Sequence, residues 1–143
     1  MERSTIEKLS PLLENILRLF LKHARDQFLK HNLTWGETRL LVLINQIEGI
    51  SQVELARELG IKPISILRRV DKLEKLGLVE RVKYKADRRV NQLYLTDKGR
   101  EAHGFILELG VKLISSALPK IEQQELKQIF DSLQKLEKGL SNL

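Results

Sequence analysis

Basic side chains dominate the residues of this sequence that could do chemistry, and they are concentrated in one segment. Between Lys62 and Arg89 the chain has ten Lys or Arg and four Asp or Glu, a net charge of +6 over 28 residues. The rest of the chain has 15 residues of each sign and is neutral. Such a focused basic block favours a polyanionic partner, although a merely solvated basic surface stays open as the alternative on charge alone.

Residue combinations for catalysis or metal binding are missing from the sequence. The chain has no cysteine, which excludes a disulfide framework, a redox thiol and a cysteine-ligated metal site. The histidines show no metal-ligand spacing, and no nucleophile-and-base set or phosphate-cradling glycine loop occurs. We therefore expect no enzyme activity, no cofactor and no metal.

Length and composition fit one globular domain over residues 1–143. Apolar residues make up 42% and charged residues 31%, which is typical of a folded chain. The start, MERSTIEKLS, has no apolar signal core, and the aliphatic run LLVLI at 40–44 is too short to cross a bilayer. We expect a cytoplasmic protein without membrane contact.

Helix-start signals outline the elements that must position the basic block. The capping-box form S/T-x-x-E predicts three helices, which begin after Ser4, Thr34 and Ser51. The first carries an apolar stripe to about residue 31, and the third is short and stops at Gly60, which suits a left-handed C-cap. A fourth helix has Pro63 at its first position and ends at Gly77.

The hydrophobic period changes after the fourth helix. Residues 78–84 and 90–96 alternate apolar and polar side chains, which predicts a β-hairpin whose loop carries the charged run KADRR. Thr96 then caps a helix that Pro119 ends, and a last amphipathic helix follows. Three glycines lower the expected regularity of the helix after Thr96: Gly99, Gly104 and Gly110.

Residues 34–96 therefore fit a winged helix-turn-helix, because two helices joined by the tight turn ELGIKP are followed directly by a basic hairpin. In the helix after Pro63, a 100° step places Ile66, Val70 and Leu73 on the inward face. The opposite face and its flanks carry Ile64, Ser65, Arg68, Arg69, Asp71, Lys72 and Lys75. Its donors suit guanine edges and phosphates in a major groove.

The chain resembles the MarR family of winged-helix transcriptional regulators, and within it the SlyA branch. The stretches that carry the resemblance are LTWGETRLLVLI, SQVELARELGIKPISILRRVDKLEKLGLVERV and DRRVNQLYLT. The last fits the wing signature of the family: an Asp, any residue, an Arg, five residues, then Leu-Thr. The resemblance implies a mainly α fold with a small β-hairpin wing, a DNA-binding lobe over 34–96, and dimerisation helices over 5–31 and 97–142.

For the recognition helix, the resemblance implies contacts to bases and phosphates by six residues: Lys62, Ile64, Ser65, Arg68, Arg69 and Lys72. Many family members have small hydroxyl residues where this chain has Ile64 and Leu67. This difference suggests apolar contact to a thymine methyl group and leaves the operator sequence open. Arg69 has a structural alternative, in which it only covers the edge of the helix.

For the wing, the resemblance implies that Arg89 reaches into the minor groove while Asp87 pairs with it and holds its direction. Arg88 and Lys85 would add phosphate contacts. The structural alternative is a surface ion pair that only stabilises the turn. Ser51 is expected at the DNA backbone, although its role as a helix N-cap is the simpler reading.

The terminal helices predict a homodimer, because they are more apolar than one winged helix can cover. A twofold dimer presents two recognition helices about one DNA turn apart, so the operator should be a pseudo-palindrome on double-stranded DNA. By resemblance, a small anionic or aromatic effector would bind between the two layers, near Phe20, His23, Arg25, Trp35 and Arg39. The predicted function is a ligand-responsive repressor; the alternative is a winged helix that binds protein or RNA and needs neither a palindrome nor Arg89.

Overall fold

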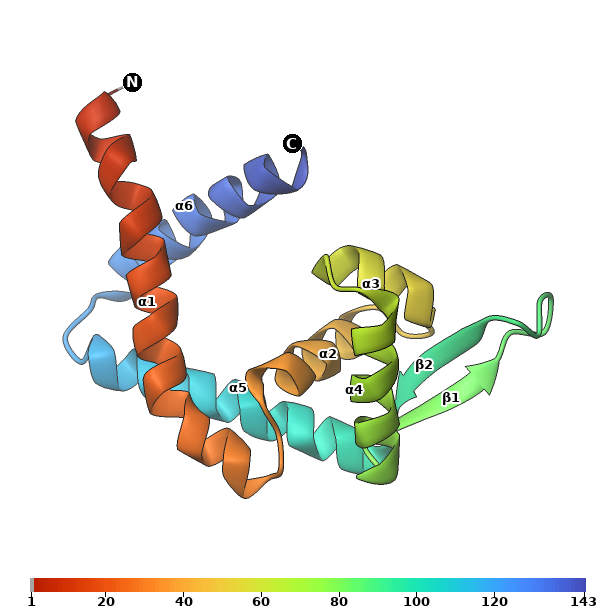
Figure 1. The fold of residues 1–143 in the computed structure, drawn as a ribbon. Helices are drawn as coiled ribbons and strands as arrows, with labels where there is room; N and C mark the ends of the chain where they lie inside the picture. The colour runs from red at the N-terminus through yellow and green to blue at the C-terminus, as the bar shows by residue number, and fades with distance from the viewer. Residues whose placement is uncertain (1) are drawn as a thin grey trace. The chain divides into compact units, whose positions relative to one another are not determined.

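The computed structural model describes residues 2–143 and is mainly helical (Figure 1). Its elements in chain order are α1 (Arg3–Lys30), α2 (Trp35–Gln46), α3 (Gln52–Leu59), α4 (Pro63–Lys75), β1 (Val79–Lys83), β2 (Asn91–Leu95), α5 (Asp97–Ala117) and α6 (Gln123–Ser141). The chain forms two compact units, Met1–Val111 and Lys112–Leu143. Within residues 2–143, no helix is long and apolar enough to cross a membrane. The element order confirms the predicted fold class.

Capping side chains set the starts of two of the three helices for which they were predicted. Ser51 accepts the Glu54 N–H at 3.1 Å, and the Glu54 carboxylate accepts the Ser51 N–H at 2.9 Å. Thr34 forms the same box with Glu37 at the start of α2. The capping box predicted at Ser4 is wrong. The Glu2 carbonyl already accepts the N–H groups of Thr5 and Ile6, so α1 begins before Ser4 can cap it.

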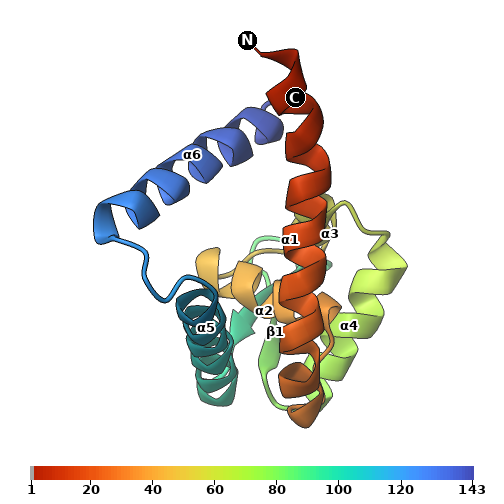
Figure 2. The ribbon, with the colours of Figure 1, turned by 90° about the vertical axis from the view of Figure 1, so that its left-hand side faces the viewer.

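The long first helix ends at Lys30, close to the predicted end at residue 31. Figure 2 shows α1 as one continuous helix, although Pro11 lies inside it and cannot donate a backbone hydrogen bond. The predicted turns are also confirmed. Gly60 has φ +60° at the end of α3, and Gly77 has φ +71° just after α4.

The core of the first unit lies around α2, which packs against α1, α3, α4 and β2. Its residues Leu40, Leu41 and Ile44 are fully buried. The face of α4 that was predicted to point inward is fully buried as well: Ile66, Val70 and Leu73. Helical periodicity was therefore sufficient to orient α4 on the core.

The hairpin joins the helices along a second edge that the sequence analysis missed. β1 and β2 pair antiparallel, from Val79 opposite Leu95 to Lys83 opposite Asn91. On the edge of β2 that faces away from β1, Leu93 accepts the Gly49 N–H at 3.1 Å and donates its N–H to the Ile50 carbonyl at 2.9 Å. Residues 49–51 are too few to show strand periodicity. They fasten the base of the hairpin to the start of α3, while its loop extends away from the helices (Figure 1).

The junction between the hairpin and α5 is tightly packed. Thr96 Oγ1 accepts the Gly99 N–H at 3.0 Å and donates to the Gly77 carbonyl at 2.5 Å, so the predicted cap is confirmed. The expected irregularity of α5 is wrong, because the helix is continuous from Asp97 to Ala117. At Gly99 a glycine is required, because a Cβ there would lie 2.0 Å from the Leu78 carbonyl oxygen.

Candidate nucleic-acid interface

The first turns of α4 present a free surface made of cationic and apolar side chains. Lys62 and Arg68 are exposed, and within residues 2–143 neither has an ion-pair partner. Ile64 is 55% exposed and Leu67 is 39% exposed. Ser65, which was predicted to flank this face, is half-buried. Guanidinium and ammonium donors beside exposed apolar groups are what base edges and phosphates in a major groove require.

The second half of α4 faces the protein more than the sequence indicated. Lys72 Nζ lies 3.4 Å from Glu37 Oε1, and Asp71 accepts a hydrogen bond from Arg81. Arg69 is half-buried, and its guanidinium lies against Gly36, where an added Cβ would be only 2.6 Å from its Cζ. Asp71 and Lys72 therefore differ from the outward position that helical phase predicted, because α2 and the hairpin flank this part of α4.

Glu37 is a buried carboxylate that joins α2 to α4. Burial raises its pKa, but hydrogen bonds from Thr34 and the charge of Lys72 outweigh burial and hold the pKa below the ordinary 4.5. The ionised form is therefore the one that the fold stabilises. The sequence offered Glu37 only as part of a capping box, and its link to Lys72 depends on how α2 and α4 pack.

Replacing Glu37 with Gln should lower the free energy of unfolding by about 1 kcal/mol at neutral pH, because charge-assisted hydrogen bonds are lost. The folded pKa lies below the unfolded value of 4.5, so this stabilisation is present above pH 4.5 and disappears as the pH falls through the folded pKa. Urea unfolding at neutral pH and in steps below pH 4.5 measures the free energy of unfolding of both proteins. The difference in this free energy between wild type and variant should narrow in acid; a constant difference would contradict the ionised pair.

The wing loop holds the pair that the resemblance implied. Asp87 Oδ1 accepts the Arg89 backbone N–H at 3.1 Å and Nε at 3.0 Å, while Oδ2 accepts Nη2 at 3.1 Å. These hydrogen bonds from Arg89 hold the pKa of Asp87 below its ordinary 3.8. The Arg89 side chain is nevertheless 91% exposed. Its guanidinium is thus oriented by a two-point contact and open to solvent.

A groove runs between the start of α3 and the wing, and it extends the candidate surface. Ser51, Arg57 and Arg89 line it together with Tyr84 and Gln92. Ser51 lies at the start of α3, and its hydroxyl is engaged in the capping box. Sequence reasoning missed Arg57 because this residue lies before the basic block, in the last turn of α3.

A second cavity, of about 740 Å³, lies between α1 and the start of α2. Three cations of α1 line it, Arg18, Lys22 and Arg25, together with Trp35 and apolar residues. Two of the five residues predicted for an effector site, Arg25 and Trp35, line this cavity. The other three, Phe20, His23 and Arg39, are not among its lining residues. Phe20 and His23 fall on the far side of α1, about 150° from the lining residues at 100° a step.

Comparison with known proteins agrees with this geometry. The MarR family model matches residues 33–90. The chain is 32% identical over 123 residues to the HTH-type transcriptional regulator BilQ of Clostridium symbiosum, with 83% of each chain covered.

Two solved structures share the fold over nearly the whole chain. Streptococcus pneumoniae FabT in complex with DNA has a TM-score of 0.74 at 22% identity, covering 98% of this chain and 97% of FabT. Staphylococcus aureus MarR in complex with salicylate and kanamycin has a TM-score of 0.83 at 19% identity, covering 98% and 95%. With the winged helix-turn-helix, the wing signature and the relative BilQ in agreement, the chain belongs to the MarR family of winged-helix transcriptional regulators.

Proposed function

We propose that the protein is a homodimeric repressor that binds a pseudo-palindromic operator and releases it when a small effector binds. The observation that carries this proposal is the pairing of a free cationic and apolar face on α4 with an oriented, exposed Arg89 on the wing. One element suits a major groove and the other a narrow minor groove. A DNA complex of the fold relative FabT supports duplex DNA as the partner.

On α4, the proposed division of labour follows exposure. Lys62 and Arg68 contact bases and phosphates, and Ser65 donates from the flank. Ile64 and Leu67 meet thymine methyl groups, because a half-exposed aliphatic side chain gains by covering apolar surface. For Arg69 and Lys72, contact with Gly36 and Glu37 competes with DNA contact, so we assign them to phosphates at the rim.

On the wing, Arg89 enters the minor groove and Asp87 holds it. Lys85 and Arg88 are exposed on the same loop and contact phosphates. Ser51 and Arg57 extend these contacts along the groove beside α3. Narrow minor grooves concentrate negative potential, so an oriented guanidinium binds there with sequence preference although it reads no unique base edge.

Arg89→Ala should weaken binding to the preferred duplex by roughly tenfold to a hundredfold while the fold stays intact. The operator is first selected from random duplexes, and binding is then measured by fluorescence anisotropy at several salt concentrations. Circular dichroism and thermal melting report the fold. Unchanged binding by a folded Arg89→Ala variant would contradict the wing assignment.

Arg88→Ala is the matched control, because it removes the same charge from the same loop. It should weaken all duplexes about equally and reduce the salt slope by about one. Single-stranded RNA serves as the competitor that tests the alternative function. If RNA displaces the operator duplex at equal concentration, an RNA-binding module becomes the better description.

A second copy of the chain is the proposed cover for apolar side chains that the monomer leaves exposed. They lie on α1 (Ile6, Leu9, Leu12, Ile16 and Leu17), on α5 (Leu107, Val111 and Ile114) and on α6 (Leu126, Ile129, Phe130, Leu133 and Leu140). No residue of α6 is buried, although the helix is amphipathic. Apolar stripes of this length are rare on monomeric surfaces and indicate an interface.

The cavity between α1 and α2 is the proposed effector site. Arg18, Lys22 and Arg25 supply positive charge and Trp35 an aromatic wall, which together fit a small aromatic anion. Salicylate is a suitable probe, since the fold relative from S. aureus was solved with it. Trp35 is the only tryptophan, so its emission should respond to salicylate and the response should weaken several-fold in Arg25→Ala. No response in the wild type would contradict the site.

A further inference from the structure

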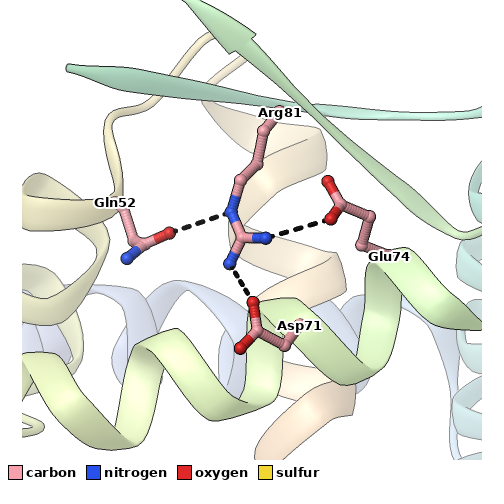
Figure 3. Close-up of polar contacts among 4 residues, drawn as sticks. All are labelled: Gln52, Asp71, Glu74 and Arg81. Carbon is pink, nitrogen blue, oxygen red and sulfur yellow. Dashed lines mark hydrogen bonds and ion pairs between the residues drawn. The ribbon is translucent and has the colours of Figure 1, made fainter. Parts of the chain in front are cut away.

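One half-buried guanidinium connects the wing to both helices of the helix-turn-helix. Arg81 lies in the middle of β1 with its side chain only 17% exposed. Its Nε donates to Gln52 Oε1 of α3 at 3.2 Å, its Nη2 to Asp71 Oδ1 of α4 at 2.6 Å, and its Nη1 to Glu74 Oε1 of α4 at 3.0 Å (Figure 3). Three elements therefore meet at one planar group.

The charge of Arg81 is paired with carboxylates of the protein itself. Asp71 and Glu74 both pair with it, so two carboxylates offset the charge of this member of the basic block. Its three nitrogens point at protein acceptors from three directions (Figure 3). A direct contact to DNA would require breaking these bonds, so Arg81 must act on DNA through the elements it joins.

The bonds of Arg81 add side-chain links between β1 and α4 to the short turn that joins them, in which the Leu78 N–H donates to the Leu73 carbonyl at 2.9 Å. The backbone pairing of Leu93 with residues 49–51 ties the hairpin to the start of α3. The described polar side-chain contacts between β1 and α4 are those of Arg81 with Asp71 and Glu74. Asp71 lies one helical turn after Arg68, so its bond to Arg81 holds the hairpin against the same helix that presents the free face.

We propose that Arg81 is a positioning residue for DNA recognition, which sets the angle between α4 and the wing so that both grooves are engaged at once. The proposal rests on the proposed DNA-binding function. It predicts that the operator contacts of α4 and of Arg89 are energetically coupled through Arg81. If Arg81 merely stabilised the lobe, its substitution would lower the fraction of folded protein but would not couple the contacts of α4 to those of Arg89.

The test is a double-mutant cycle with Arg81→Lys and Arg89→Ala on the selected operator. Lysine keeps the charge but cannot reach three acceptors with a planar fork. Alone, Arg81→Lys should weaken operator binding about tenfold and binding to a random duplex less than about twofold. In a protein that already carries Arg89→Ala, Arg81→Lys should weaken operator binding by less than about threefold. The wing then has no Arg89 contact left to lose when it is misplaced. Equal losses in both backgrounds would overturn the proposal.

Two further variants keep this result interpretable. Arg100→Lys is the control, since Arg100 lies in the first turn of α5 and its described side-chain hydrogen bonds go only to Leu95 and Asp97; it should leave operator binding unchanged. Glu74→Gln weakens one of the three bonds of Arg81 at an exposed residue and serves if Arg81→Lys does not fold. Its effect on operator binding should also depend on Arg89, but the coupling should be smaller. A wild type that prefers no duplex would refute the DNA-binding function, whereas tight wild-type binding with an additive cycle refutes only the role of Arg81.

Discussion

Gly99→Ala should lower the free energy of unfolding by about 3 kcal/mol, at the upper end of the range for overpacking. The added methyl group would lie 2.0 Å from the Leu78 carbonyl oxygen and 3.3 Å from Leu95 Cβ. The obstacle is backbone, which cannot turn away as a side chain can. Relief requires moving α5 away from the end of the hairpin, and this would break the hydrogen bonds of Thr96. Urea unfolding followed by circular dichroism measures the loss.

Gly104→Ala is the matched control in the same helix. Apart from the backbone of its own helix, no described atom of the chain lies within 4 Å of a Cβ at Gly104, so the substitution meets open space in one copy of the chain. Alanine should then stabilise the protein by up to about 1 kcal/mol, because glycine is the weaker helix former. The same substitution five residues apart should therefore act with opposite signs. A destabilising Gly104→Ala, or a neutral Gly99→Ala, would contradict the packing described at the two sites.

Deleting residues 120–143 should convert the proposed dimer to monomer or aggregate and weaken operator binding by at least about a hundredfold. The expected loss is large because joining two DNA-binding lobes makes the second contact intramolecular, which is worth factors of about 10² to 10⁴. Size-exclusion chromatography with light scattering reports the oligomeric state, and fluorescence anisotropy reports binding. A soluble dimer that survives the deletion would contradict the role of α6.

Point substitutions separate loss of the interface from loss of the chain segment. Phe130, which is 61% exposed, lies in the apolar stripe of α6, so Phe130→Glu should shift the dimer toward monomer. Gln128→Glu adds the same side chain away from that stripe and should leave the dimer intact. If both variants dissociate equally, added charge rather than the apolar stripe would be responsible.

The parts of the fold that depend on neighbours in sequence were predicted well. The starts of α2 and α3 follow from a side chain and a carboxylate three residues apart. The turns at Gly60 and Gly77 follow from the need for positive φ, and the buried face of α4 from a 100° step. The failure at Ser4 shows the limit of such signals, since a capping pattern works only where the helix actually begins.

The candidate site was predicted in part, for a related reason. The Asp87–Arg89 pair was within reach because the two residues are neighbours on one loop. Lys72 and Glu37 are 35 positions apart, and Arg81 and Gln52 are 29 apart, so no local pattern reveals either contact. At the cavity between α1 and α2, Phe20 and His23 are not lining residues, because they lie about 150° around α1 from the residues of that helix that line it.

By itself, the sequence determined a helical chain with a basic winged helix-turn-helix, because capping, glycine turns and hydrophobic period are local properties of the chain. Only the tertiary structure decided which charges are free. Arg68 is exposed, and Arg89 is exposed while paired only with Asp87 of its own loop among the described residues, whereas Arg81 and Lys72 are engaged by carboxylates on other elements. All four count equally toward net charge. What distinguishes them is which helix or strand packs beside them, and that depends on contacts between residues far apart in the chain.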